Sequence, residues 1–436
     1  MVGCHCKDKK TLIREPARSV VLAGKYDVIV AGGGPAGFAA ALRAAREGCR
    51  TLLLEKMECL GGIWTSGLIP WIIDAQNKTG ILQEICAALT ACGGRLWARE
   101  KAFTAPPEEL RFLLEQLCLQ AGVVIRYGTV VCDAIANARK LEYVITESKS
   151  GREAWQGTFY IDATGDGDLA ALAGCGFDYG NAEGIAQPAS LSALLGGIDP
   201  EKQSEFFVNI GGESAKEKLL AAMRNAGVEP SYSQPSLFHY GCGIVGLMSH
   251  HAYGVVPFDA DSRTQAIISG RAELHRQINA LRTLPGWEKL VLLGTAAQLG
   301  IREGRRIKGK ARVSRADLAA AHYPSDTVCI PTFCIDIHAP DPKECKSILQ
   351  DRPNMPPAGY GIPFRALLSF DLDNLLLAGR CISGDFHMHG SYRVTGNAVP
   401  LGEAAGFGAA AAVKKGIPLE AVTDLPCFSP KKLFRL

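Results

Sequence analysis

The stretch Tyr26–Lys56 reads YDVIVAGGGPAGFAAALRAAREGCRTLLLEK. It begins as a short apolar strand, turns at a run of glycines, continues as an alanine-rich helix, and closes with a second apolar strand. Gly32 permits the tight turn, Gly34 lets the backbone approach a pyrophosphate, and Gly37 lets the helix pack against the sheet. We therefore predict a βαβ unit that binds a dinucleotide at the N-terminus of its helix.

An acid ends the second strand of this unit. Glu55 follows the glycines by about 20 residues, where a carboxylate accepts both hydroxyls of the adenosine ribose and repels a 2′-phosphate. This position favours FAD or NAD over NADP. Pro35, Ala36 and Lys56 lie beside these residues and are also predicted to contact the cofactor.

Glycines recur at predicted strand ends much later in the chain, and they favour FAD over NAD. A long cofactor held by a discontinuous domain requires several such approaches of the backbone. A helix predicted to begin near Pro400 would direct its positive end toward the flavin. The further cofactor-binding candidates are Gly61, Gly62, Val131, Ala163, Thr164, Gly165, Gly379, Arg380 and Pro400.

Several stretches together resemble a family of FAD-dependent oxidoreductases related to the glutathione-reductase and fumarate-reductase type flavoproteins. They are GGGPAG (Gly32–Gly37), LGGIWTSGL (Leu60–Leu68), DATGDGDLAALAG (Asp162–Gly174), GIREGRRIKG (Gly300–Gly309) and AGRCISGDFHMHGSYRV (Ala378–Val394). The resemblance extends over most of the chain and implies FAD as the cofactor. It implies no particular substrate.

The predicted fold class is α/β, with a discontinuous Rossmann-like FAD-binding domain and an inserted α+β substrate or cap domain. We expect the first domain at 26–184 plus 360–415 and the second at 185–359. Residues 1–25 form an N-terminal extension and residues 416–436 a C-terminal tail. In the inserted domain, helices are expected around 201–226 and 264–284, and strands around 328–338.

Two departures from related flavoproteins limit the chemistry. Trp64 and Ile69 lie near the places where disulfide reductases carry redox cysteines, which disfavours a thiol–disulfide relay. No second GxGxxG follows a predicted strand, so a nicotinamide would bind only transiently, or electrons would come from the substrate or a partner protein. Many related flavoproteins place Gly-Asp where this chain has Gly379-Arg380, and Asp385 is a possible substitute.

The densest polar cluster expected near the flavin contains His387, His389 and Arg393 as catalytic candidates, with Asp385 and Tyr392 beside them. If the segment is extended, both histidines lie on one face. An imidazole could then exchange the proton that accompanies hydride transfer. Arg393 could stabilise reduced flavin or bind a substrate carboxylate. The alternative is that these residues only hold a loop in place.

A second cluster contains Arg302, Glu303, Arg305 and Arg306. The favoured interpretation is structural, with the arginines pairing acids between domains, and anion recognition is the alternative. His239, His250 and His251 belong to the predicted inserted domain and could line a cavity over the flavin. Ordinary packing is the favoured interpretation for these histidines.

Composition excludes several classes of function. The formal net charge is only +3, and no dense Lys/Arg block indicates nucleic-acid binding. No signal peptide or run of about 18 apolar residues is present, so we expect a cytoplasmic protein without a membrane span. Fifteen cysteines without a CxxC pair are typical of reduced thiols. Cys4-His5-Cys6 offers too few ligands for zinc, and no metal site is predicted.

The sequence thus predicts an enzyme, an FAD-dependent oxidoreductase that transfers a hydride between a small organic substrate and flavin. A flavin monooxygenase is the first alternative. The second is an electron-transfer subunit that relays electrons through FAD to a partner protein. The absence of clustered cysteine spacing for an iron–sulfur centre weakens this second alternative. The substrate and the oligomeric state are not predicted.

Overall fold

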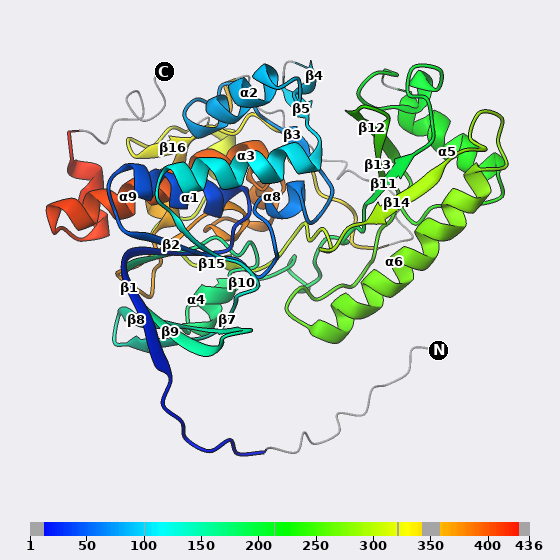
Figure 1. The fold of residues 1–436 in the computed structure, drawn as a ribbon. Coiled ribbons are helices and arrows are strands. Elements are labelled where there is room, and N and C mark those ends of the chain that lie inside the picture. The colour runs from blue at the N-terminus through cyan, green and yellow to red at the C-terminus, as the bar shows by residue number, and fades with distance from the viewer. Residues whose placement is uncertain (1–12, 100, 213, 321, 342–357, 427–436) are drawn as a thin grey trace.

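The main sheet of the molecule is mixed, and most helices of the main body lie on one side of it (Figure 1). The computed structural model describes residues 13–99, 101–212, 214–320, 322–341 and 358–426. The sheet has seven strands in the order β6-β2-β1-β9-β8-β7, with β18 beside β9. Their bounds are β1 (Val21–Ala31), β2 (Thr51–Leu54), β6 (Val124–Arg126), β7 (Val130–Asn137), β8 (Lys140–Ser148), β9 (Gly151–Asp162) and β18 (Leu375–Leu377). This arrangement confirms the predicted α/β class.

The parallel part of this sheet brings strand ends from distant parts of the chain to one edge. Strands β6, β2, β1, β9 and β18 run parallel to their neighbours, whereas β7 and β8 pair antiparallel and join this part through β9. The predicted strand–helix–strand unit is present as β1, α1 (Pro35–Arg46) and β2. Strand β1 starts at Val21 and not at Tyr26, because Val21–Lys25 pair with β9.

Helix α1 packs closely against the long helix α9 (Thr395–Lys415), and glycines on α9 make this contact possible. A Cβ on Gly402 would lie 1.9 Å from the Ala36 carbonyl oxygen, and one on Gly406 would lie 2.2 Å from that of Ala40. Only glycine permits such an approach at these positions. The two helices therefore fix each other's position at the edge of the sheet where β1 ends.

Smaller elements complete the main body. The helices are α2 (Ile81–Ala91), α3 (Pro107–Gln120), α4 (Asp168–Leu172), α7 (Arg315–Ala319) and α8 (Phe386–Tyr392). The short strands are β3 (Trp71–Ile73), β4 (Leu96–Arg99), β5 (Ala102–Thr104), β10 (Phe177–Asp178), β15 (Arg306–Ile307), β16 (Thr327–Cys329) and β17 (Ile362–Pro363). They form one three-stranded sheet and two pairs. Of the strands predicted around 328–338, only β16 is present.

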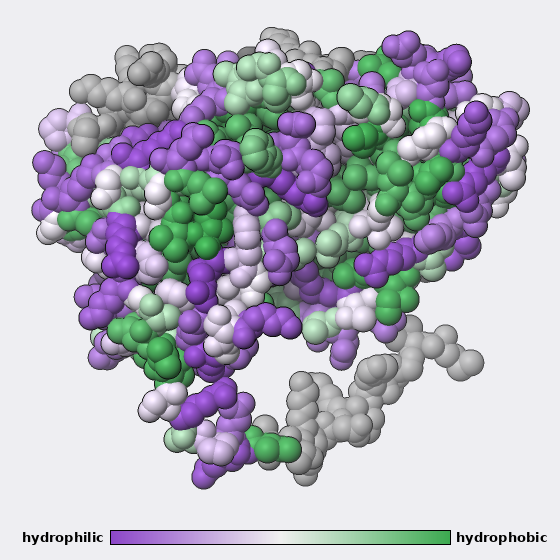
Figure 2. Space-filling view, in the orientation of Figure 1, coloured by the Kyte–Doolittle hydropathy of each residue, from purple (hydrophilic) through white to green (hydrophobic). Residues whose placement is uncertain are grey.

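A separate antiparallel sheet lies to one side of the main body (Figure 1). Its strands, in order, are β12 (Ser236–Gly241), β13 (Ile244–Met248), β11 (Ala193–Gly196) and β14 (Val291–Thr295), accompanied by helices α5 (Ala215–Asn225) and α6 (Ala260–Leu281). Helix α6 buries Leu274, Ile278 and Leu281 in this unit's own core, and its outer face is mostly hydrophilic (Figure 2). This amphipathic pattern explains why a helix was predictable here.

The two hydrophobic cores divide the chain unevenly. The smaller core draws on residues between Ala189 and Leu299 together with Leu68, and the larger core also contains Ile307, Val328 and Ile337. The predicted domain boundaries remain a prediction. The Cys4-His5-Cys6 segment lies outside the described residues. Where the chain is described, no helix combines the length and apolar composition needed to cross a membrane.

Candidate cofactor site

The glycine turn after β1 presses directly against the end of β9. Gly32 has φ of +95°, and a Cβ there would lie 2.6 Å from the Ala163 carbonyl oxygen. A Cβ on Gly37 would lie 1.7 Å from the Gly32 carbonyl oxygen, so the first turn of α1 also needs glycine. Gly34 differs, because a Cβ there would meet no atom within 4 Å. The turn is therefore crowded on the protein side and open at Gly34.

Glu55 lies beside this turn and is buried, with 5% of its surface exposed. Its Oε2 accepts a hydrogen bond from the Gly33 amide at 2.5 Å, and its Oε1 accepts one from the Met57 amide at 2.7 Å. Burial raises the pKa of Glu55, although these two backbone bonds act in the opposite direction. Each carboxylate oxygen can accept more than one hydrogen bond, so ribose hydroxyls can still be bound.

A cavity opens over these residues and continues past the ends of β9 and β18 to the start of α9. Fourteen of the predicted site residues line it: Gly32, Gly34, Pro35, Ala36, Glu55, Lys56, Gly62, Val131, Ala163, Thr164, Gly165, Gly379, Arg380 and Arg393. Five do not: Gly37, Gly61, Pro400, His387 and His389. Gly37 and Gly61 instead shape the surrounding backbone, since a Cβ on Gly61 would lie 2.6 Å from the side chain of Thr65.

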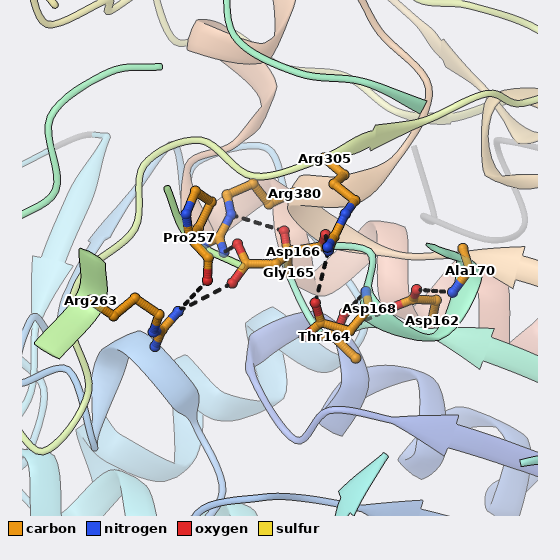
Figure 3. A network of polar contacts seen from close by, with 10 residues as sticks. All are labelled: Asp162, Thr164, Gly165, Asp166, Asp168, Ala170, Pro257, Arg263, Arg305 and Arg380. Carbon is orange, nitrogen blue, oxygen red and sulfur yellow. Dashed lines mark hydrogen bonds and ion pairs between the residues drawn. The ribbon is translucent and has the colours of Figure 1, made fainter. Parts of the chain in front are cut away.

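A network of arginines and acids supports one side of the cavity, which it lines through Thr164, Gly165, Asp168 and Arg380 (Figure 3). Arg380 donates to Asp166 Oδ1 at 2.6 Å and to the Gly165 carbonyl at 3.0 Å. Arg305 donates to the Asp166 carbonyl at 2.9 Å and to Asp168 Oδ1 at 3.0 Å. Asp166 is thus the acid that the sequence analysis lacked beside Arg380. The signal for it was the acid-rich turn directly after Gly165.

Asp162, at the end of β9, holds the turn that follows this strand in place through hydrogen bonds. Its Oδ1 accepts hydrogen bonds from the amide and hydroxyl of Thr164, and its Oδ2 accepts one from the Ala170 amide. Burial nevertheless raises the pKa of Asp162 to about 6, because these donors only partly offset the lost hydration. The segment that carries Thr164 and Gly165 is therefore held in place by one fully buried carboxyl group.

The segment of the two candidate histidines is the helix α8, so the extended conformation that would place both on one face is not present. Asp385 caps α8 by accepting the Met388 amide at 2.7 Å, and its other oxygen accepts the Arg315 amide. Asp385 is thus engaged in capping and does not line the cavity. Residues two apart on a helix point in different directions, so His387 and His389 share no face.

His389 is fully buried and lies on the inner side of α8. Burial, with the positive charges of Arg306, Arg393 and Arg380, holds the pKa of His389 well below its usual range. A buried imidazole of this kind is neutral and lies outside the cavity lining. Its predicted catalytic role, like that of the half-buried His387, is not favoured by this geometry.

Helix α9 begins at Thr395, and Pro400 lies inside it, so the predicted start near Pro400 was wrong. The helix N-terminus still reaches the cavity, through Thr395 and Ala398. Three buried atoms of lining residues have no hydrogen-bond partner: Thr395 Oγ1, Gln298 Oε1 and Arg393 Nε. Buried polar atoms are normally paired, so these three indicate that a polar ligand completes the site.

Other lining residues were missed by the sequence analysis. Thr129 lies between β6 and β7, and Gln298, Leu299 and Ile301 come from the loop after β14. No local sequence pattern shows that a loop from the unit with the separate antiparallel sheet will line a cavity of the main body. Among the described residues, no group of three or more His, Cys, Asp or Glu side chains is placed to hold a metal ion.

These features fit a dinucleotide cofactor. The open face at Gly34 lies at the N-terminus of α1, where backbone amides favour phosphate. Glu55 offers acceptors for a ribose at the end of β2, and the unpartnered atoms of Gln298, Arg393 and Thr395 offer partners for a polar ring system elsewhere in the cavity. The donor and acceptor set is therefore suited to FAD.

Comparison with known proteins finds relatives over part of the chain. Thiamine thiazole synthase of Methanococcus vannielii is 32% identical over 151 residues, which are 32% of this chain and 56% of that protein. The chain thus spans little more than half the length of the curated relatives it matches. A thiamine thiazole synthase of Methanococcus maripaludis is 31% identical over 149 residues, with the same coverage.

Solved structures show more distant likeness. A geranylgeranyl bacteriochlorophyll reductase-like protein of Thermoplasma acidophilum is 15% identical, with a TM-score of 0.47, covering 94% of this chain and 82% of that one. The p-nitrophenol 4-monooxygenase of Pseudomonas putida is 11% identical, with a TM-score of 0.49 and coverage of 94% and 85%. The family model described as "FAD dependent oxidoreductase" matches residues 27–432, nearly the whole chain, and the protein therefore belongs to the FAD-dependent oxidoreductase family.

Proposed function

We propose that this protein binds FAD in the cavity between the ends of β1, β2, β9 and β18 and the start of α9, and transfers a hydride between FAD and a small organic substrate. The observation that carries the proposal is the lining of one cavity by Glu55 directly after β2, Gly34 of the glycine turn, Arg393 just before α9, and Thr395 at its start. Such a set combines acceptors for a ribose, an approach for a pyrophosphate, and donors for a flavin.

Each part of the lining has its own role in this proposal. Glu55 accepts hydrogen bonds from the adenosine ribose, and the open backbone at Gly34 lets the pyrophosphate approach the α1 N-terminus. The N-terminus of α9 supplies positive partial charge near the flavin. When bound, FAD would supply the hydride-transfer chemistry, and the guanidinium of Arg393 would favour negative charge on the reduced ring.

The test uses the purified protein and its visible spectrum. FAD content is measured after denaturation, with and without prior incubation with excess FAD. The FAD-bound protein is then mixed anaerobically with small alcohols, amines and hydroxy acids while flavin absorbance is followed. Bleaching by one of these small molecules supports the proposal. Failure to hold FAD contradicts the site, and bleaching only by a protein donor contradicts the reaction.

A further inference from the structure

A group of buried and partly buried polar side chains adjoins the cavity on the side of the separate sheet. This inner polar cluster consists of Gln187, His251, Arg302, Asp336, His338 and Arg393. Arg393 belongs both to the cluster and to the cavity lining, and Arg302 directly follows the lining residue Ile301. The cluster therefore continues the proposed flavin site toward the second unit of the molecule.

Direct contacts hold the acidic and basic members of the inner polar cluster together. Arg393 Nη2 donates to the Asp336 carbonyl at 2.9 Å and to Asp336 Oδ2 at 3.3 Å. His338 Nε2 lies 3.4 Å from the same Oδ2. The His251 and His338 rings are 5.1 Å apart between centroids, in an edge-to-face arrangement. Four members of the cluster thus form one continuous chain of contacts.

Arg302 lies near these four residues and is held by hydrogen bonds of its own. Its two hydrogen bonds both come from Nη1, which donates to the Pro188 carbonyl at 2.7 Å and to Ser190 Oγ at 2.8 Å. Gln187, next to Pro188, accepts the His338 amide at 3.1 Å through its side-chain oxygen. Arg302 is therefore anchored by one nitrogen, beside the histidines and the remaining guanidinium.

The charges in this region do not balance. The side chains of Arg302, Arg306 and Arg393 carry three positive charges. The nearby carboxylates of Glu303 and Asp336 carry only two negative charges. Glu303 accepts hydrogen bonds from Arg306 Nη1 and from the backbone amide of Gln187. Asp336 is left to serve both Arg302 and Arg393. Among these contacting groups, one positive charge has no counterpart.

The protonation states preserve this excess at neutral pH. Burial, and then the charge of Arg393, lowers the pKa of Arg302 to about 10, so the guanidinium stays charged. Burial and the charge of Arg302 lower the pKa of His338 to about 4, so its ring is neutral. Burial alone would raise the pKa of Asp336, but the hydrogen bond from His338 and the charges of Arg393 and Arg302 hold this pKa well below its usual range.

Several polar atoms of the inner polar cluster have no partner. They are Gln187 Nε2, His251 Nε2, His338 Nδ1 and Arg393 Nε. The side chains of Gln187, His251 and His338 belong to residues that are 3%, 6% and 6% exposed, so bulk water does not satisfy them. Natural proteins rarely leave so many neighbouring buried groups unpaired. Neutral His338, whose Nε2 faces Asp336, presents Nδ1 as an acceptor for a hydroxyl or amine.

We propose that the inner polar cluster binds the carboxylate of a small organic acid and so positions this substrate beside the flavin, which makes the substrate of the proposed oxidoreductase a carboxylate. The planar forks of Arg302 and Arg393 match a carboxylate in geometry as well as charge. A phosphate ester with two negative charges fits less well, because Asp336 lies in the cluster. This inference rests on the proposed function for the identity of the reaction.

Calorimetry on the wild-type protein with bound FAD tests the inference without any variant. The probes are acetate, glycolate and benzoate, with acetamide and benzamide as uncharged counterparts of the same shape, at constant ionic strength. We expect at least one carboxylate to bind at one equivalent and at least about tenfold more tightly than its amide, as loss of a charge-assisted bond implies. Equal binding of acids and amides overturns the inference, as does equally tight binding of phosphate.

Substitutions then locate the site. Arg302→Gln and Arg393→Gln should each weaken carboxylate binding by about 10- to 100-fold. If the fold of Arg302→Gln is impaired, Arg302→Lys takes its place in the test. This variant keeps the positive charge and should retain part of the affinity for carboxylates. Arg224→Gln removes an exposed guanidinium that pairs with Glu229, and it should leave affinity unchanged. Equal affinity of the Arg393→Gln variant and the wild type overturns the inference.

The two proposals fail in different ways. If the protein does not bind FAD, the proposed function fails, and calorimetry on the FAD-free protein still decides whether carboxylates bind. If the protein binds one FAD but prefers no carboxylate over its amide, the carboxylate site fails and the FAD site stands.

Discussion

Arg380 Nη2 lies 2.6 Å from Asp166 Oδ1, and this pair ties the end of β18 to the turn after β9. The other oxygen of Asp166 lies 3.7 Å from Arg263 Nη1, which comes from α6 of the separate unit (Figure 3). One buried carboxylate thus links three segments that are far apart in the sequence. It also holds a wall of the cavity between them.

Replacing Asp166 with Asn should destabilise the protein. The substitution removes the negative charge and leaves Arg380 and Arg263 facing a neutral amide, although Asp166 is only 4% exposed. Breaking one side of a buried charged contact costs about 1 to 3 kcal/mol. We expect a lower melting temperature for Asp166→Asn, measured by differential scanning fluorimetry.

Asp373→Asn is the matched control. Asp373 pairs with Arg139 at 2.8 Å, but both side chains are more than half exposed. Exposed pairs of this kind contribute little to stability. Equal melting temperatures for the two variants would show that the Asp166 link is no stronger than a surface pair.

Gly37→Ala and Gly34→Ala should separate folding from cofactor binding. The added Cβ of Gly37→Ala meets the Gly32 carbonyl oxygen at 1.7 Å, so the glycine turn must shift, and overpacking of this kind costs about 1 to 3 kcal/mol. The added Cβ of Gly34→Ala meets nothing within 4 Å, and Gly34 has an ordinary φ of −66°. We expect Gly34→Ala to keep its FAD-free melting temperature.

The affinity for FAD completes the comparison of these two glycine variants. The Cβ of Gly34→Ala projects into the space proposed for the pyrophosphate, so its affinity for FAD should fall, as followed by quenching of flavin fluorescence. Unchanged FAD affinity in Gly34→Ala would place the pyrophosphate elsewhere. Unchanged stability of Gly37→Ala would contradict the close contact between the turn and α1.

The first βαβ unit could be predicted because local spacing decides it. Gly32 and Gly37 are each required by a backbone contact, with the end of β9 and within the glycine turn respectively, whereas Gly34 leaves open space at the N-terminus of α1. The segment around His389 could not be predicted in this way. Its alternating polar residues suggested a strand, but Asp385 accepts the Met388 amide and begins a helix. An acid in the N-cap position was the signal that the alternation obscured.

The inner polar cluster lay beyond sequence reasoning for a different reason. Gln187, His251, Arg302 and Asp336 come from separate loops, and only the packing of the two units brings them together. The cluster at 302–306 was predicted to pair acids or to bind an anion. The structure shows both kinds of environment, since Arg306 contacts Glu303 whereas Arg302 contacts only neutral oxygens.

Glu55→Gln should lower FAD affinity almost as much as Glu55→Ala. Both carboxylate oxygens accept backbone amides, from Gly33 and Met57, and a Gln side chain must turn its NH₂ group toward one of these donors. Loss of such a bond to a charged group corresponds to about 10- to 100-fold in affinity. Titration of the FAD-free protein with FAD measures it. Exposed Glu58 provides the control Glu58→Gln, which should bind FAD as the wild type does.

Asp162 should make stability depend on pH, in a direction that its environment fixes. Burial raises the pKa of Asp162 from 3.8 to about 6, whereas in the unfolded chain the carboxyl group keeps its ordinary value. The folded protein therefore binds this proton more tightly. The stabilisation is fully present below pH about 4 and is lost as the pH rises through about 6. A shift of this size corresponds to about 3 kcal/mol.

The variant Asp162→Asn isolates this effect, because an amide does not titrate. Asn has one acceptor oxygen for the three hydrogen bonds from Thr164 and Ala170, so the variant should be less stable than the wild type at low pH. The difference in melting temperature should narrow between pH 4.5 and 7, measured with excess FAD throughout. A gap that stays constant or widens with rising pH would mean that Asp162 is already ionised in the folded protein at low pH, with its three donors outweighing burial.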